Sequence, residues 1–273
     1  MRLLRRLLRN LKSLKMRSNT IRLAISPCPN DTFMFDAIIN RRINLDGLDV
    51  EVTYLDIEQL NSAAMEQRYD VTKCSTAILR AVGEHYTLLD SGSALGRGNG
   101  PLLVRRKGET TPLKRIAVPG EHTTANRLVG RLFPEIEERV PMLFSDIAEA
   151  VERGEFDGGV LIHEGRFVYQ RRNLELVADL GLEWEARMGL PLPLGSIIAS
   201  KTLDEETRVR FERLLRRSIE YAFANPMASR EFIKEHAQEL EDEVIEKHIA
   251  LFVNDYSVTL GDEGSKAVEA LLE

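Results

Sequence analysis

The amino-acid sequence predicts an α/β fold with two lobes and a ligand cleft between them. The chain has 273 residues, nearly twice the roughly 150 residues of a typical domain. Apolar runs of strand length alternate with helical segments, an order that is typical of sheets with parallel strands. Two links, one polar near residues 105–114 and one proline-rich at 189–195, set a middle segment apart from the rest of the chain.

The first part of the chain predicts a parallel sheet. Strands are expected at 21–25, 50–55 and 70–74, and helices at 32–40, 57–67 and 75–82. Asn30 or Asp31 is a candidate N-cap for the first helix and Asp56 for the second, because short polar side chains accept hydrogen bonds from free helical N–H groups. Three strands that alternate with helices in this way indicate parallel strands joined by right-handed crossovers.

A glycine-rich stretch, SGSALGRGNGP at 91–101, follows a short strand at 86–89. Its glycines resemble those of a phosphate-binding loop, but the G-x-x-x-x-G-K-[ST] order is missing, so no nucleotide is implied. We interpret the stretch as a mobile turn whose glycines adopt positive φ. A strand at 102–105 and the polar link RKGETTPLK follow it.

The middle segment has an α/β order of its own. Within it, strands are predicted at 115–118 and 158–162 and helices at 123–132 and 144–151. After the second link, a strand is predicted at 196–199, and the chain from 204 onward is predicted to be helical. We therefore expect an outer lobe formed by residues 18–107 and 195–273 and an inserted lobe formed by residues 108–194. A chain that crosses twice between α/β lobes predicts the type II periplasmic-binding-protein fold, in which ligands bind in a hinged cleft.

Charge and cysteine content exclude several classes of protein. The formal net charge is −6, which argues against a nucleic-acid partner because phosphate contacts require a basic face. Cys28 and Cys74 are too few for a disulfide framework or a cysteine-rich zinc site, which favours a reducing compartment. The five histidines include no pair with zinc-binding spacing, so no metal is expected. No apolar run approaches the roughly 20 residues of a membrane span, so we expect a soluble protein.

Residues 1–17 form a basic N-terminal extension with seven positive charges and no acidic residue, so residues 18–273 carry a net charge of −13. Arginines interrupt every pair of leucines, which argues against a secretory signal and favours a cytoplasmic location. We expect a disordered extension. The alternative is weak membrane contact through residues 1–15, without a stable anchor, because one short amphipathic helix binds membranes only marginally.

Three predicted strand-to-helix junctions are candidates for the ligand site: SPCPND at 26–31, Lys73-Cys74-Ser75-Thr76, and His122-Thr123-Thr124-Ala125. A helix N-terminus attracts carboxylates, although any one of these junctions alone could be an ordinary helix cap. Because all three fall at equivalent points of the predicted topology, the sequence favours a small carboxylated ligand.

His163 differs from the other histidines because it follows the apolar run GGVLI and should lie at the C-terminal edge of a sheet. An imidazole in a cleft can act as a base, although a single histidine at a strand end can also be a structural hydrogen-bonding residue. His236 and His248 fall in helical stretches and are expected to be packing or surface residues. Cys74 has no histidine near it in sequence, so we expect its thiol to line a pocket rather than to act as a nucleophile.

Five segments together resemble one enzyme family: SPCPNDTFMFDA, ALGRGNGPL, VPGEHTTA, LIHEGRFVYQ and GLPLPLG. They are similar, in the same order, to the 1,4-dihydroxy-6-naphthoate synthases of the futalosine route to menaquinone. The resemblance extends from about Ile21 to the C-terminus and does not include residues 1–17.

The resemblance implies the two-lobed fold described above and a lyase that needs no cofactor. The implied reaction converts cyclic dehypoxanthine futalosine to 1,4-dihydroxy-6-naphthoate and releases dihydroxyacetone. The resemblance also implies that His163 is the proton acceptor and that the substrate is bound at Lys73, Cys74, Ser75, Thr124 and Ala125. Cys74 replaces a more usual aliphatic residue, and we expect little consequence because contact there would be through the backbone.

Two alternatives remain at the level of sequence. The first is chorismate dehydratase, which belongs to the same pathway and fold, and the HTTA and L-I-H-E segments argue against it. The second is a solute-binding protein that captures a carboxylated ligand without converting it. The lack of a recognisable export signal argues against that reading.

Overall fold

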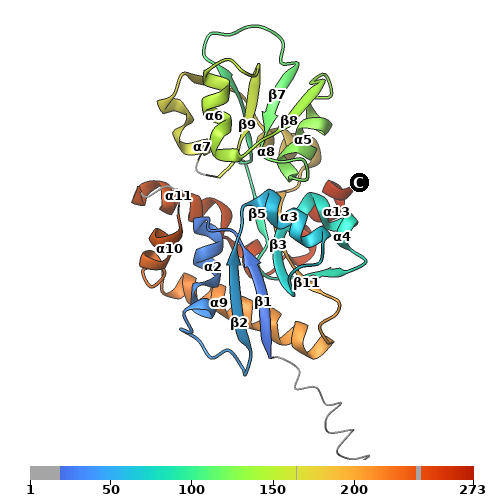
Figure 1. Ribbon diagram of the computed structural model, residues 1–273, viewed down its shortest axis with the longest axis vertical. Coiled ribbons are helices and arrows are strands. Elements are labelled where there is room, and N and C mark those ends of the chain that lie inside the picture. The colour runs from blue at the N-terminus through green and yellow to red at the C-terminus, as the bar shows by residue number, and fades with distance from the viewer. Residues whose placement is uncertain (1–18, 164, 238–240) are drawn as a thin grey trace, which may run out of the picture.

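The computed structural model describes residues 19–163, 165–237 and 241–273, and its elements form two lobes, one above the other in Figure 1. The basic segment 1–17, for which the sequence predicts disorder or weak membrane contact, lies outside the described residues. Within the described residues, no helix combines the length and the apolar character that crossing a bilayer requires.

The lower lobe is built on a six-stranded sheet. Its strand order is β2-β1-β3-β11-β4, and β5 also pairs with β11. β1 is parallel to β2 and β3, which confirms the parallel sheet predicted from the first part of the sequence, whereas β11 is antiparallel to β3, β4 and β5. The strands are β1 (Thr20–Ile25), β2 (Asp49–Tyr54), β3 (Val71–Ser75), β4 (Tyr86–Leu88), β5 (Ala94–Gly96) and β11 (Leu192–Ser200).

The upper lobe is built on a five-stranded sheet with the order β10-β6-β9-β7-β8. β7 is parallel to β8 and β9, and β6 is antiparallel to β9 and β10. Successive residues of β7 face opposite sides: Ile116 packs in one buried cluster with Trp184, and Ala117 packs in another with Ile147. The strands are β6 (Leu102–Arg106), β7 (Arg115–Val118), β8 (Glu138–Pro141), β9 (Gly158–Leu161) and β10 (Leu174–Asp179).

Both points where the chain passes between the sheets lie earlier than the sequence predicts. β6 was expected in the outer lobe, as part of residues 18–107, but it pairs with β9 and β10 of the upper sheet. The polar stretch after it, taken for the first link, is therefore a loop inside the upper lobe. Most of the apolar, proline-containing stretch taken for the second link is already strand. β11 begins at Leu192 and pairs with β5 across a register shift near Pro193, so only residues 189–191 lie outside helix and strand.

Helices cover both sheets (Figure 1). In the lower lobe, Phe35 of α2 and Phe211 of α9 pack in one buried cluster with Leu23 of β1. The helices are α2 (Pro29–Ile39), α3 (Ile57–Met65), α4 (Leu79–Val82), α5 (Thr124–Leu132), α6 (Phe144–Glu152), α7 (Gly165–Val168), α8 (Leu180–Met188), α9 (Glu205–Ala224), α10 (Arg230–His236), α11 (Asp242–Phe252), α12 (Asp255–Val258) and α13 (Gly261–Leu272), with 3-10 turns η1 (Thr76–Ile78) and η2 (Tyr169–Arg171).

The predicted helix starts are only partly correct. Asp56 caps α3 in a capping box with Gln59, as expected. The prediction that Asn30 or Asp31 caps α2 is wrong: this helix begins at Pro29, a residue whose fixed φ suits the first helical position, and Cys28 is its N-cap residue.

Two further expectations need correction. The glycine-rich stretch at 91–101 is not only a turn, because it contains β5, which is hydrogen-bonded to β11. The helix expected over 75–82 has the predicted extent, but its first turn, from Thr76 to Ile78, is 3-10 and only the last four residues form the α-helix α4.

Candidate active site

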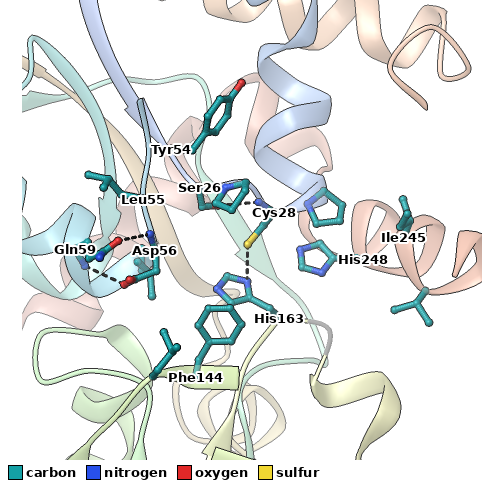
Figure 2. Close-up of a pocket in the computed structure, with 15 residues that line it drawn as sticks. Ser26, Cys28, Tyr54, Leu55, Asp56, Gln59, Phe144, His163, Ile245 and His248 are labelled. Carbon is teal, nitrogen blue, oxygen red and sulfur yellow. Dashed lines mark hydrogen bonds between the residues drawn. The ribbon is translucent and has the colours of Figure 1, made fainter. Parts of the chain in front are cut away.

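A cavity lies between the two lobes. Of the six residues for which the resemblance implies a role, five line this cavity: Lys73, Ser75, Thr124, Ala125 and His163. The other lining residues come from both lobes and are Asn30, Ile57, Ala94, Gly100, Pro101, Thr123, Ile162, Arg166, Leu194, Gly195, His248 and Phe252. A neighbouring pocket, shown in Figure 2, shares Ile57, His163 and His248 with this cavity. Both pockets therefore meet at the two histidines.

His163 lies two residues after the end of β9 and lines both pockets. Its Nδ1 lies 3.5 Å from the Cys28 sulfur, and its ring meets Phe144 edge-on with 5.0 Å between centroids (Figure 2). Burial, which disfavours the imidazolium ion, and the positive charge of Lys73 lower the pKa of His163 to about 3. The imidazole is therefore neutral near pH 7 and able to accept a proton.

His248 faces His163 from the lower lobe. The two rings are nearly parallel, with 9° between their planes and 6.0 Å between centroids (Figure 2). His248 is 1% exposed, and its Nε2 lies 3.0 Å from Oδ1 of Asn30. Burial lowers the pKa of His248 well below 6.5, and positive charge on neighbouring groups lowers it further. The sequence predicted a packing or surface role for His248 and missed its place in the cleft.

Lys73 and Asp31 form a buried ion pair at the lower wall of the cavity. Lys73 Nζ donates to Asp31 Oδ1 over 2.6 Å, and neither side chain is more than 7% exposed. The other carboxylate oxygen accepts hydrogen bonds from the backbone N–H and the hydroxyl of Ser26, at 3.0 and 2.6 Å. Asp31 is therefore the counter-ion of Lys73, a role that its position in the SPCPND segment did not reveal.

Strand alternation separates the three residues of the predicted substrate loop. Lys73 and Ser75 line the cavity, whereas Cys74 packs on the other face of β3 with Ile78 and Tyr86. The expectation that the Cys74 thiol lines the pocket is therefore wrong. Burial raises the pKa of Cys74 to about 12, which agrees with the prediction that this thiol is not a nucleophile.

The Ser75 junction is not the free helix N-terminus that the sequence suggests. The Ser75 N–H group donates to Oδ1 of Asn61 at 2.7 Å, and Asn61 Nδ2 donates back to the Ser75 hydroxyl at 3.0 Å. The helix that follows is also too short to have a substantial dipole. Ser75 therefore contributes to the cavity through its side chain rather than through a helix start.

The start of α5 matches the prediction better. Thr123 is its N-cap residue and accepts a hydrogen bond from the Asn126 N–H group at 3.2 Å. The hydroxyl of Thr124 donates to the Leu194 carbonyl at 2.9 Å and accepts from the Ala77 N–H group at 3.3 Å, so it joins this helix to two segments of the lower lobe. The first turn of α5, including Ala125, thus faces the cavity from a fixed position.

Arg166 is a second cation of the cavity, and no sequence pattern singled it out. Its guanidinium donates to Asp179 at 2.9 Å and to the Gly100 carbonyl at 2.6 Å, and its side chain is 14% exposed. Asp179 in turn caps α8. The cavity therefore contains two cations, Lys73 and Arg166, each paired with a buried carboxylate.

A further direct contact joins the lobes beside the cleft. Glu58 of α3 accepts hydrogen bonds from the His122 imidazole at 2.5 Å and from the His122 backbone N–H at 3.2 Å. Both lobes thus contribute to the walls of one cavity.

This architecture is that of the periplasmic-binding-protein-like proteins, which bind ligands between two lobes. A zinc-bound ligand-binding component of an import system from Staphylococcus aureus superimposes with a TM-score of 0.69 at 11% identity, over 93% of this chain and 90% of that one. A crystal structure of an Archaeoglobus fulgidus protein is more similar, with a TM-score of 0.88 at 34% identity, over 93% of this chain and 96% of that one.

Residues 21–273 match the protein family described as menaquinone biosynthesis, and the chain belongs to this family. A relative from Thermus thermophilus is 44% identical over 92% of both chains. One from Streptomyces coelicolor is 42% identical over 94% of this chain and 93% of its own. Both relatives are named 1,4-dihydroxy-6-naphtoate synthase.

Proposed function

We propose that the protein is a 1,4-dihydroxy-6-naphthoate synthase, a carbon–carbon lyase of menaquinone biosynthesis. It converts cyclic dehypoxanthine futalosine to 1,4-dihydroxy-6-naphthoate and releases dihydroxyacetone. The observation that carries the proposal is the position of His163 in a cavity lined by both lobes of a chain that belongs to this family.

His163 is the base in this proposal. With a pKa lowered to about 3, its imidazole has a free lone pair at neutral pH and can remove a proton from the bound substrate. Loss of that proton starts the cleavage of the carbon–carbon bond to the sugar remnant. The protonated imidazole then gives its proton to the departing three-carbon fragment, which leaves as dihydroxyacetone. Closure of the lobes excludes water, which strengthens the electrostatic interactions during this step.

The substrate carries a ring carboxylate and a hydroxyl-rich cyclic remnant, and the cavity offers groups for both. The first turn of α5, at Thr124 and Ala125, suits the carboxylate because its leading N–H groups have no intrahelical partner. Lys73 and the Ser75 hydroxyl suit the hydroxyl groups, and Cys74 would contact substrate only through its backbone. Because the net charge of the chain is −6, a carboxylated substrate is held by such local groups and not by overall charge. The same negative charge argues against a nucleic-acid partner.

We also place the enzyme in the cytoplasm. This is supported by its two buried cysteines, Cys28 and Cys74, which form no disulfide and suit a reducing compartment, and by the biosynthetic role of its relatives.

The experiment that tests the proposed function is incubation of the purified protein with cyclic dehypoxanthine futalosine, followed by chromatography and mass spectrometry. Formation of 1,4-dihydroxy-6-naphthoate with an equal amount of dihydroxyacetone is expected. Tight, saturable binding without product would instead indicate a solute-binding protein, and turnover of chorismate alone would indicate the dehydratase of the same pathway.

A further inference from the structure

We propose that Nδ1 of His248 accepts a hydrogen bond from a hydroxyl group of the ligand that occupies the cleft. His248 would thus be a second functional histidine, which binds the hydroxyl-bearing part of the substrate next to His163. The inference rests on the proposed function, since it assigns one contact of that same substrate.

The position of His248 places it in contact with whatever fills the cleft. It lies on α11 of the lower lobe and lines both the central cavity and the neighbouring pocket. Its ring is parallel to that of His163, with 6.0 Å between the centroids, so the two imidazoles border the same space from opposite lobes (Figure 2). A ligand within reach of one histidine is therefore within reach of the other.

The hydrogen bonds behind His248 determine which of its ring nitrogens carries the proton. Asp31 accepts hydrogen bonds from Lys73 and, over 2.9 Å, from Nδ2 of Asn30. Because a carboxylate only accepts, the amide of Asn30 is oriented with its Oδ1 toward His248, 3.0 Å from Nε2. Nε2 must then be the protonated nitrogen. In the neutral ring, Nδ1 is left with a lone pair.

That lone pair has no hydrogen-bond partner within the described part of the chain, and the Nδ1 atom is buried. Buried polar atoms are rarely left unpaired, because they lose their bond to water without gaining another. The ring neighbours Phe252, at 4.8 Å, and Phe167, at 6.4 Å between centroids, have no conventional donor. A hydroxyl group of a ligand would satisfy Nδ1, whereas a carboxylate has no proton to donate. The site therefore suits the hydroxyl-bearing part of the substrate.

Two substitutions separate this role from a structural one. His248→Gln keeps a polar atom near the position of Nε2, where it can bond to Asn30, and loses the acceptor at Nδ1. His248→Asn does the reverse, because its polar atoms are attached to Cγ, as Nδ1 is. His85→Gln is the matched control, since His85 is exposed and lines neither pocket.

We expect the Gln variant to lose about 10- to 100-fold in kcat/KM for cyclic dehypoxanthine futalosine, the effect of one buried hydrogen bond lost. The Asn variant should be the more active of the two although its Tm is the lower, and the control should match the unsubstituted protein. The inference is overturned if the Asn variant, with the lower Tm, also has the lower kcat/KM, or if the Gln variant keeps the kcat/KM of the unsubstituted protein. If the unsubstituted protein shows no turnover, the proposed function itself has failed.

Discussion

The buried ion pair between Lys73 and Asp31 supports a prediction about stability that can be worked out from the structure. Replacing Lys73 with Met removes the cation and leaves a carboxylate that is fully buried. Removing one partner of such a pair typically costs about 3–5 kcal/mol, because the remaining charge is uncompensated. Domains are usually stable by only about 5–15 kcal/mol, so Lys73→Met should remove a large part of the free energy of unfolding.

Urea denaturation at pH 7, followed by circular dichroism, measures this loss. A second substitution, Asp31→Asn, removes the unpaired charge, and the double variant should recover at least about 1 kcal/mol relative to Lys73→Met alone. Lys247→Met is the control, because Lys247 forms an exposed pair with Glu243 and pairs of that kind contribute about 1 kcal/mol or less. A loss below about 1 kcal/mol for Lys73→Met, or strict additivity in the double variant, would refute the reasoning.

Two further predictions concern pH and lobe closure. Because the pKa of His163 is about 3, kcat/KM should stay level from pH 8 down to pH 5, whereas a base with the ordinary pKa of 6.5 would be only about 3% unprotonated at pH 5. An acidic limb with its midpoint near 6.5 would contradict this. Because the pKa of His163 is lower in the folded chain, the unfolded chain binds a proton at this histidine first as the pH falls. The folded chain therefore loses stability progressively from pH 6.5 toward pH 3, and Tm measured over that window should fall. Glu58→Gln weakens the contact with His122 between the lobes, and we expect a fall of about two- to fivefold in kcat/KM with a larger radius of gyration in solution scattering. Unchanged values of both would show that this contact does not hold the lobes closed.

The sequence was most informative for features that depend on the residue pattern of a single segment. The apolar run before His163 predicts a strand end, and the Asp56 cap and the parallel order of β1, β2 and β3 follow from local patterns of the same kind. The boundary of the inserted lobe was less predictable. β6 has the same apolar character whichever sheet it joins, so only its pairing with β9 decides where the chain crosses.

The part of the site that depends on distant segments could not be predicted. Cys28 and His163 are 135 positions apart, and His248 and Asn30 are 218 positions apart. His248 belongs to an apolar helical stripe, and such a stripe has the same spacing whether it faces a core or a cleft. The role of Asp31 as the partner of Lys73 was hidden for a similar reason, since an acidic residue in a first helical turn is also typical of a simple N-terminal interaction.

The central claim is that His163 is the base of a lyase reaction, and the turnover of a His163 variant tests it most directly. His163 has φ of 51°, in the left-handed region that Asn tolerates better than Ala, so His163→Asn is the variant least affected by backbone strain. With cyclic dehypoxanthine futalosine as substrate, we predict a loss of about 10²- to 10⁴-fold in kcat with an unchanged circular dichroism spectrum. Turnover within a few-fold of the unsubstituted protein would contradict the account.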